Sequence, residues 1–295
     1  MLRILLIFTG IVIFAQMFIV GQHLARRSSL DICLRLQPLW RSLAPVLLLV
    51  PLATFSLILV MRPPPEVTLG LAILAAAPGA PVTARRAEAA GADIGYASAL
   101  QLTLALVAPV FLPATLGLFD WAFDISPPAV TPGTITGQVA IVTFVPATLG
   151  WLLSRYAPEF SQHYDTVLSR AAKALFVALL IIVILALIFV PELRAMLLIG
   201  WTGSLAVLLM ASFAIAFGHT FGGKRADRRS GLAIATVARN LGLALYIAEL
   251  SPASVAAIPT ILTYALVGIL LALPYSNWIK RQSDAAQLKT GPSRG

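Results

Sequence analysis

The chain has 295 residues, of which 59% are hydrophobic and only 11% are charged. So many apolar side chains cannot be buried inside a soluble domain of this length, and the composition therefore predicts a membrane protein. The net charge of +9 does not indicate nucleic-acid binding, because the basic residues occur in short clusters between apolar runs and not on one polar face.

Residue types for catalysis or metal binding are sparse. Cys33 is the single cysteine, and the three histidines His23, His163 and His219 are far apart, so neither a disulfide nor a metal-ligand spacing is present. The apolar runs contain no nucleophile–base pair and no paired carboxylates. The sequence therefore predicts no enzyme, no cofactor and no metal site.

Apolar runs of about 20 residues, the length that crosses the hydrocarbon core, recur along the whole chain. They predict an all-α polytopic membrane protein with nine transmembrane helices. The expected helices are 3–22, 44–62, 66–91, 94–119, 133–155, 168–191, 194–220, 229–250 and 252–279. The segment 26–43 has the pattern of an amphipathic helix at the membrane surface. The polar tail 282–295 is expected to be disordered.

The charges between the expected helices indicate the orientation. One face of the membrane receives the basic clusters: Arg26, Arg27, Arg35, Arg41, Arg155, Arg170, Lys173, Lys224, Arg225, Arg228, Arg229, Lys280 and Arg281. The other face receives Asp120, Asp124, Glu192 and Glu249, with Arg62 and Arg194. The positive-inside rule therefore predicts an outer N-terminus and a cytoplasmic C-terminus, in a bacterial inner membrane. A cleaved signal peptide over 1–22 is the alternative, but it would place the first basic cluster outside.

The expected helix 229–250 is interrupted by polar residues near its centre. Arg239 lies about ten residues from its cytoplasmic end, close to the bilayer centre. An arginine there costs about 2.5–3.5 kcal/mol, so it should face the protein interior and have a partner. Two interpretations stay open: an arginine that pairs internally or caps carbonyls, and a guanidinium that offers its paired donors to an anionic substrate. Asn240 and Gly242 favour the second, because an amide binds polar groups and glycine lets a partner approach.

The expected helix 66–91 is interrupted by prolines. Pro78 and Pro81, with Gly79 between them, remove backbone donors and break the helix. The half-helix that follows would direct its positive N-terminal end toward the break, where an anion would be stabilised. Thr83 could cap this half-helix or contact the substrate. Arg85 is a weaker candidate, because it lies within reach of the cytoplasmic surface.

Polar residues on the neighbouring helices are ambiguous, since they could line a cavity or hold helices together. Gln101 is the strongest of them, because an amide well inside an apolar helix is hard to explain by packing. The others are Thr103, Thr202, Ser204, Thr260, Thr263 and Tyr264. The candidate substrate-binding residues are therefore Arg239, Asn240, Thr83, Gln101 and Arg85, and the candidate helix-break residues are Pro78, Gly79, Pro81 and Gly242.

The two broken helices occupy matching positions in the two halves. Segments 44–119 and 194–279 each consist of an ordinary helix, a broken helix with an Ala-Arg pair, and a long helix. Equivalent helices are offset by five crossings, an odd number, so the two triplets should insert with opposite orientation. This is the inverted-repeat plan of secondary carriers.

These stretches resemble the bile acid:sodium symporter family. Pro78-Gly79-Ala80, Gly91-Ala92-Asp93 and Pro109 are similar in spacing to the family's first crossover motif, and the sequence from Thr236 to Ala244 is similar to the second. The resemblance implies two discontinuous crossing helices in one transporter unit (1–281), with a core domain (44–119 and 194–279) and a panel domain (3–22 and 133–191). It also implies alternating access.

The chain departs from the pattern of the sodium-coupled members. The family's Ser-Asn pair is replaced by Thr83-Ala84, its acidic residue by Ala235, and the glutamine of its Gln-Asn pair by Arg239. A sodium site needs several oxygen ligands, so coupling to a proton, exchange or facilitated transport is at least as well supported as coupling to sodium. We expect a divergent member that carries a small organic anion.

Two other functions stay open. A metalloid exporter of the related superfamily would resemble its relatives in having a cysteine near the first break, where this chain has Val82. A structural or receptor-like membrane protein would be favoured if protein groups fully paired Arg239.

Overall fold

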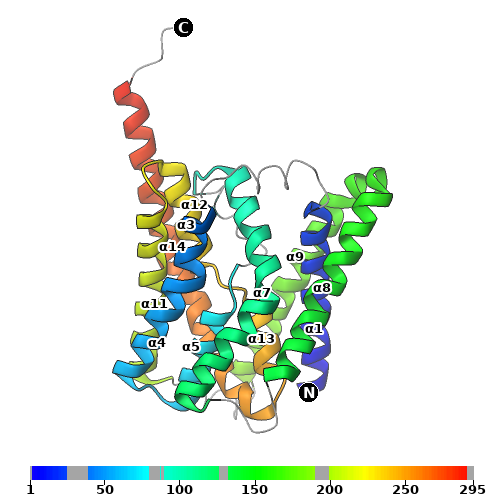
Figure 1. The fold of residues 1–295 in the computed structure, drawn as a ribbon, viewed down its shortest axis with the longest axis vertical. Coiled ribbons are helices and arrows are strands. Elements are labelled where there is room, and N and C mark those ends of the chain that lie inside the picture. The colour runs from blue at the N-terminus through cyan, green and yellow to red at the C-terminus, as the bar shows by residue number, and fades with distance from the viewer. Residues whose placement is uncertain are drawn as a thin grey trace.

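The computed structural model describes residues 2–24, 39–79, 87, 90–125, 132–189 and 199–290, and its described elements are helices without strands (Figure 1). Five described helices are long and apolar enough to cross a membrane: Arg41–Met61, Tyr96–Phe123, Gly200–Phe221, Ala226–Glu249 and Ala253–Gln282. The apolar helices Ile7–His23 and Pro65–Ala76 are shorter. The predicted all-helical membrane protein is therefore confirmed, and the count of nine crossings stays a prediction.

The helices follow the expected segments closely in chain order. In the first part of the chain they are α1 (Leu2–Leu24), α3 (Leu39–Ala44), a π-helical turn (Pro45–Leu49), α4 (Val50–Met61), α5 (Pro65–Ala76), α7 (Ile94–Phe123), α8 (Pro132–Tyr156) and α9 (Pro158–Phe189). In the second part they are α11 (Gly200–Phe221), α12 (Ala226–Val237), α13 (Leu241–Glu249), a 3-10 turn (Pro252–Ala257) and α14 (Ile258–Thr290).

Local side-chain chemistry explains several boundaries. Prolines stand in the first turn of α5, α8 and α9, where a missing N–H removes no helical hydrogen bond. Asp93 caps α7 by accepting a hydrogen bond from the amide of Tyr96 at 3.0 Å. Arg62 and Asp124 adopt left-handed conformations that end α4 and α7.

Three helices, α1, α8 and α9, pack against one another and form what we call the three-helix group. Small residues bring α1 and α8 together: a Cβ added to Gly21 would lie 1.9 Å from the carbonyl oxygen of Ala147, and one added to Gly150 would lie 2.0 Å from that of Phe18. Backbones approach this closely only where a side chain is absent, as is common between helices in membranes. His23 of α1 also lies 3.0 Å from the Asp165 carboxylate of α9.

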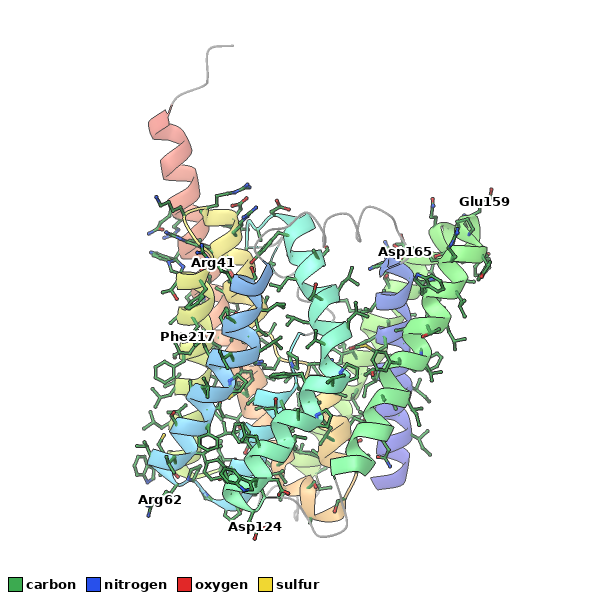
Figure 2. The ribbon with its side chains drawn as sticks, viewed as in Figure 1. Arg41, Arg62, Asp124, Glu159, Asp165 and Phe217 are labelled. Atoms are coloured by element: carbon green, nitrogen blue, oxygen red, sulfur yellow. The ribbon has the colours of Figure 1, made fainter. Side chains whose placement is uncertain are left out.

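The other described helices form a second, larger group, which contacts the three-helix group through α1 against α13 and α7 against α8. Figure 1 shows α1, α8 and α9 along one side of the molecule and α4, α11 and α12 along the opposite side. The first residues of α1 and the last residues of α14 lie at opposite ends of the molecule (Figure 1). Arg62 and Asp124 lie at the end that holds the N-terminus, whereas Arg41, Glu159 and Asp165 lie at the other end (Figure 2).

Two segments differ from the expectation from hydropathy. Helix α9 starts at Pro158, ahead of the expected 168, because an apolar run marks only the membrane-embedded part of a longer helix. Helix α14 continues to Thr290, well into the tail 282–295 that we expected to be disordered, where Ala285, Ala286 and Leu288 are strong helix formers. Cys33 and most of the expected surface helix 26–43 lie outside the described residues.

Candidate functional site

The second expected break separates α12 from α13. Helix α12 ends at Val237 and α13 begins at Leu241. Between them Ala238 (φ −79, ψ 89) and Asn240 (φ −76, ψ 85) leave the helical conformation. The side-chain oxygen of Asn240 accepts a hydrogen bond from the amide of Leu243 at 3.1 Å, and therefore caps α13. Gly242 lies inside α13, one position after its start, and not in the break itself.

The first expected break follows α5. Helix α5 ends at Ala76, and Ala77 is non-helical (φ −103, ψ 79). Gly79 has a φ of +69, and a Cβ added to it would lie 2.7 Å from the Cβ of Leu104 on α7. Both the conformation and the close packing therefore require glycine at this position. Pro78 lies in the same non-helical stretch; the candidates Pro81, Thr83 and Arg85 lie outside the described residues.

The two breaks contact each other through their backbones. The amide of Asn240 donates a hydrogen bond to the carbonyl oxygen of Ala77 at 3.1 Å. Helix ends leave donors and acceptors without partners inside the helix. Here the start of one helix supplies the donor and the end of another supplies the acceptor, so a polar backbone group from each break is satisfied inside the protein.

Arg239 lies in the second break and is almost completely buried, with 2% of its surface exposed. Its Nη1 donates to the carbonyl oxygen of Val46 at 3.3 Å, whereas its Nε and Nη2 have no hydrogen-bond partner in the structure as described. Within the same residues it forms no ion pair. Since a guanidinium needs acceptors for all of its N–H donors, Arg239 is only partly satisfied by the described residues.

A π-helical turn explains why the carbonyl of Val46 is free to accept. In the turn Pro45–Leu49 the amide of Val50 donates to Pro45, so it is withdrawn from Val46, its partner in a regular α-helix. The next amide in a π-helical register would be that of residue 51, which is Pro51 and has no N–H. The carbonyl of Val46 is therefore left for Arg239.

A cavity of about 300 Å³ lies between the second break and α14. Its lining includes Ala238, Arg239, Tyr264, Gly268, Ser276 and Asn277. Arg239 is the charged residue of this lining, which otherwise consists of apolar side chains and a few neutral polar ones. The Tyr264 hydroxyl lies beside the guanidinium and donates to the carbonyl oxygen of Val237 at 3.0 Å. The cavity therefore combines an apolar wall with one positive charge.

The structure does not bring all the candidate residues to this cavity. Gln101 is buried on α7, and neither it nor Asn240 lines the cavity. Sequence reasoning did not identify Val46, Ser276 or Asn277. The prolines at 45 and 51 were the available signal for Val46, but a π-helical turn cannot be inferred from two prolines alone.

Metal binding has no support in the described part of the chain, where no three His, Cys, Asp or Glu side chains are grouped closely enough to hold an ion. His23 instead contacts Asp165, and His219 contacts Tyr275 and Trp278.

The comparisons with known proteins identify a family for most of the chain. Residues 10–193 match the family model SBF, described as the Sodium Bile acid symporter family. The match covers more than half of the chain and includes the first break, but it ends before α12. A comparison with curated proteins found no match. Because this family model matches more than half of the chain, the chain belongs to the sodium bile acid symporter family, which is the family that its motifs resemble.

Proposed function

We propose that the protein is a secondary carrier that moves a small organic anion across the membrane by alternating access, with Arg239 as the positive charge that binds the substrate. The family match supports a transporter. The observation that carries the anion proposal is the buried guanidinium of Arg239, whose Nε and Nη2 lack partners among the described residues beside a cavity.

The chemistry of the cavity favours an organic anion. A buried charge that keeps unused donors is unstable without a ligand, and charge-assisted hydrogen bonds from a guanidinium to a carboxylate or sulfonate are among the strongest in proteins. The apolar lining suits a carbon skeleton attached to that anionic group. A volume of about 300 Å³ lies at the lower end of the range of small-molecule sites.

The packing of the helices supports alternating access. We assign the three-helix group to the panel domain and the larger group to the core domain. In this assignment the breaks after α5 and α12, joined by the hydrogen bond between Asn240 and Ala77, are the crossing of two inverted repeats. Movement of one group against the other would then expose the cavity beside the breaks to each side of the membrane in turn.

We further propose that sodium is not required. Ala235, at the position of the family's acidic residue, is fully buried and has no oxygen in its side chain. The fixed charge of Arg239 would repel a cation: two like charges 4 Å apart interact by about 4 kcal/mol at an effective dielectric constant near 20. The guanidinium can instead hold permanently the positive charge that bound sodium supplies in coupled relatives.

A binding screen tests both parts of the proposal. Purified protein is heated with monocarboxylates, dicarboxylates or organic sulfonates in sodium, potassium or choline chloride at constant ionic strength. At least one class should raise the unfolding temperature by mass action, equally in the three salts. If no class stabilises the protein, the anion proposal is wrong. If sodium raises the affinity tenfold or more, about 1.4 kcal/mol of coupling, sodium independence is wrong.

A further inference from the structure

Glu249, the last residue of α13, is a buried carboxylate with an unused oxygen. Only 2% of its surface is exposed. Its Oε1 accepts a hydrogen bond from the Thr9 hydroxyl of α1 at 3.2 Å. Its Oε2 is buried without a hydrogen-bond partner, and Glu249 forms no ion pair in the part of the chain that the structure describes.

Among the described side chains, the elements packed against α13 offer Glu249 no positive charge. These elements are α1, α5, α14 and the turn Pro252–Ala257. Neither this turn nor the stretch 7–22 of α1 contains an ionisable side chain. The other ionisable residues of α1 are His23, which contacts Asp165, and Arg3, whose side chain lies outside the described residues. Helix α5 has Glu66, which is exposed in the first turn, and α13 itself has Tyr246.

Helix α14 has Tyr264, Tyr275 and a group of charged residues that starts at Lys280. Tyr264 donates to Val237, and Tyr275 contacts His219. The start of α14 is the end of this helix that is closer to Glu249 in the chain. Lys280 lies about 33 Å along the helix axis from that start. The C-terminal end of α13 adds a partial negative charge of its own. Glu249 is therefore surrounded by neutral or negative groups in the described structure.

An ionised carboxylate in these surroundings is costly, because a buried charge needs a partner. A bound proton removes the charge. It also turns the carboxyl group into a hydrogen-bond donor, while the other oxygen can still accept from Thr9.

The contact between Thr9 and Glu249 lies where the three-helix group meets the larger group. On the same face of α1, Ile13 and Gln16 lie opposite Gly242: their side chains come within 3.7 and 3.8 Å of a Cβ built on that glycine. An apolar cleft of about 430 Å³, lined by Ile7, Phe14, Val142 and Tyr246 among others, runs along the same boundary. Glu249 therefore lies at the boundary between the two groups.

We propose that Glu249 is a proton-binding site, and that the bound proton holds α13 against α1. Without the proton, the carboxylate gains from contact with water, which favours the arrangement in which α13 and α1 separate. Acidification thus favours the closed contact and alkaline conditions favour the open one. The consequence for transport, that a proton is coupled to the movement, rests on the carrier function proposed above; the proton site itself does not.

Infrared difference spectroscopy of the full chain in lipid tests the site directly. At neutral pH, well above the value of about 4.3 at which a glutamate in a model peptide titrates, the parent protein should show a carboxylic acid C=O band that alkaline buffer removes. Glu249→Gln should lack this band, and Thr9→Val should shift its frequency, because the hydrogen bond to the carboxyl is lost. Glu66→Gln, which changes an exposed glutamate of α5, is the matched control and should keep the band. A band that persists in Glu249→Gln, or no band in the parent, would overturn the proposal.

Cysteine cross-linking tests the effect on the helices. Ile13→Cys and Gly242→Cys, in a Cys33→Ser background, place two thiols across the contact between α1 and α13. Thiol reactivity itself changes with pH, so the yield is expressed relative to the same pair carrying Glu249→Gln. This ratio should fall as the pH rises, and a constant ratio would overturn the proposed link between the proton and the contact. Neither measurement uses an anion or transport. The proton-site proposal can therefore fail while the anion-carrier proposal stands, and the anion-carrier proposal can fail while the proton-site proposal stands.

Discussion

The amide of Asn240 and the carbonyl oxygen of Ala77, 3.1 Å apart, form a hydrogen bond that joins the ends of two interrupted helices. Non-helical backbone at membrane depth is tolerated only where protein or a water-filled cavity surrounds it. Protein surrounds the breaks here, because each break satisfies a backbone group of the other, and a cavity lies beside the second. This arrangement places Arg239, in the break between α12 and α13, next to the cavity.

Replacing Arg239 with alanine should abolish anion binding and leave a folded protein. A hydrogen bond to a charged group contributes about 1.5–3 kcal/mol, so the affinity should fall at least tenfold. The unfolding temperature without ligand should change little, because removal of a partly unpaired buried charge offsets the loss of the hydrogen bond to Val46 and of the packing of a large side chain. Arg239→Lys should restore binding only in part, since an ammonium lacks the planar pair of donors.

Isothermal titration and thermal unfolding of the same samples separate binding from stability. Arg155→Ala, which removes an exposed arginine of α8, is the matched control and should bind as the parent does. An Arg239→Ala protein that binds the anion normally and unfolds at a much lower temperature would show that the arginine is structural.

Replacing Gly79 with alanine should lower the free energy of unfolding by more than the cost of a positive φ at a non-glycine residue. A non-glycine residue at positive φ costs about 1–3 kcal/mol, and the added Cβ would also lie 2.7 Å from the Cβ of Leu104. Gly223→Ala is a matched control, because Gly223 has a φ of +78 with open space around it. Thermal unfolding in detergent should show the larger loss for Gly79→Ala. Equal losses would mean that the first break does not pack against α7 as described.

Much of the second break could be predicted from the sequence, because Arg239 and Asn240 are polar residues in the middle of a long apolar run. The interruption falls at these residues. Their individual roles were harder to infer. Asn240 was expected to contact the substrate, whereas in the structure its side-chain oxygen caps α13. A polar residue at the start of a helix can serve either purpose. The sequence does not show which amide its side chain accepts from.

The contacts that join distant parts of the chain could not be predicted. Glu249 was counted among the outer acidic residues, because a carboxylate at the end of an apolar run usually reaches water. Instead it is buried and accepts a hydrogen bond from Thr9, which is 240 residues away in the chain. The carbonyl of Val46 likewise becomes free to accept a hydrogen bond because the helix changes locally to a π-helical register. The spacing of apolar residues in the sequence does not reveal such a change.

Replacing Gly21 with alanine should loosen the three-helix group. Alanine is normally favoured over glycine in a helix by about 1 kcal/mol, but here its methyl group would lie 1.9 Å from the carbonyl oxygen of Ala147. The backbones of α1 and α8 would have to move apart, so the unfolding temperature should fall. Gly117→Ala in α7 is the control, because nothing lies within 4 Å of its added Cβ, and it should be neutral or stabilising. A Gly21→Ala protein as stable as the Gly117→Ala protein would contradict the close approach of α1 and α8.

Cysteine labelling in intact cells should show which end of the molecule faces outward. The charge pattern places Cys33 in the cytoplasm and the turn after α13 outside. Ser251 in that region is buried, whereas Ala253 is exposed in the turn Pro252–Ala257, so Ala253→Cys is the better reporter. A membrane-impermeant thiol reagent should label Ala253→Cys and leave the parent protein, whose one thiol is Cys33, unlabelled. Permeabilised cells provide the control that Cys33 can react. Labelling of the parent from outside would reverse the orientation, and the basic ends of α12 and α14 would then face away from the cytoplasm.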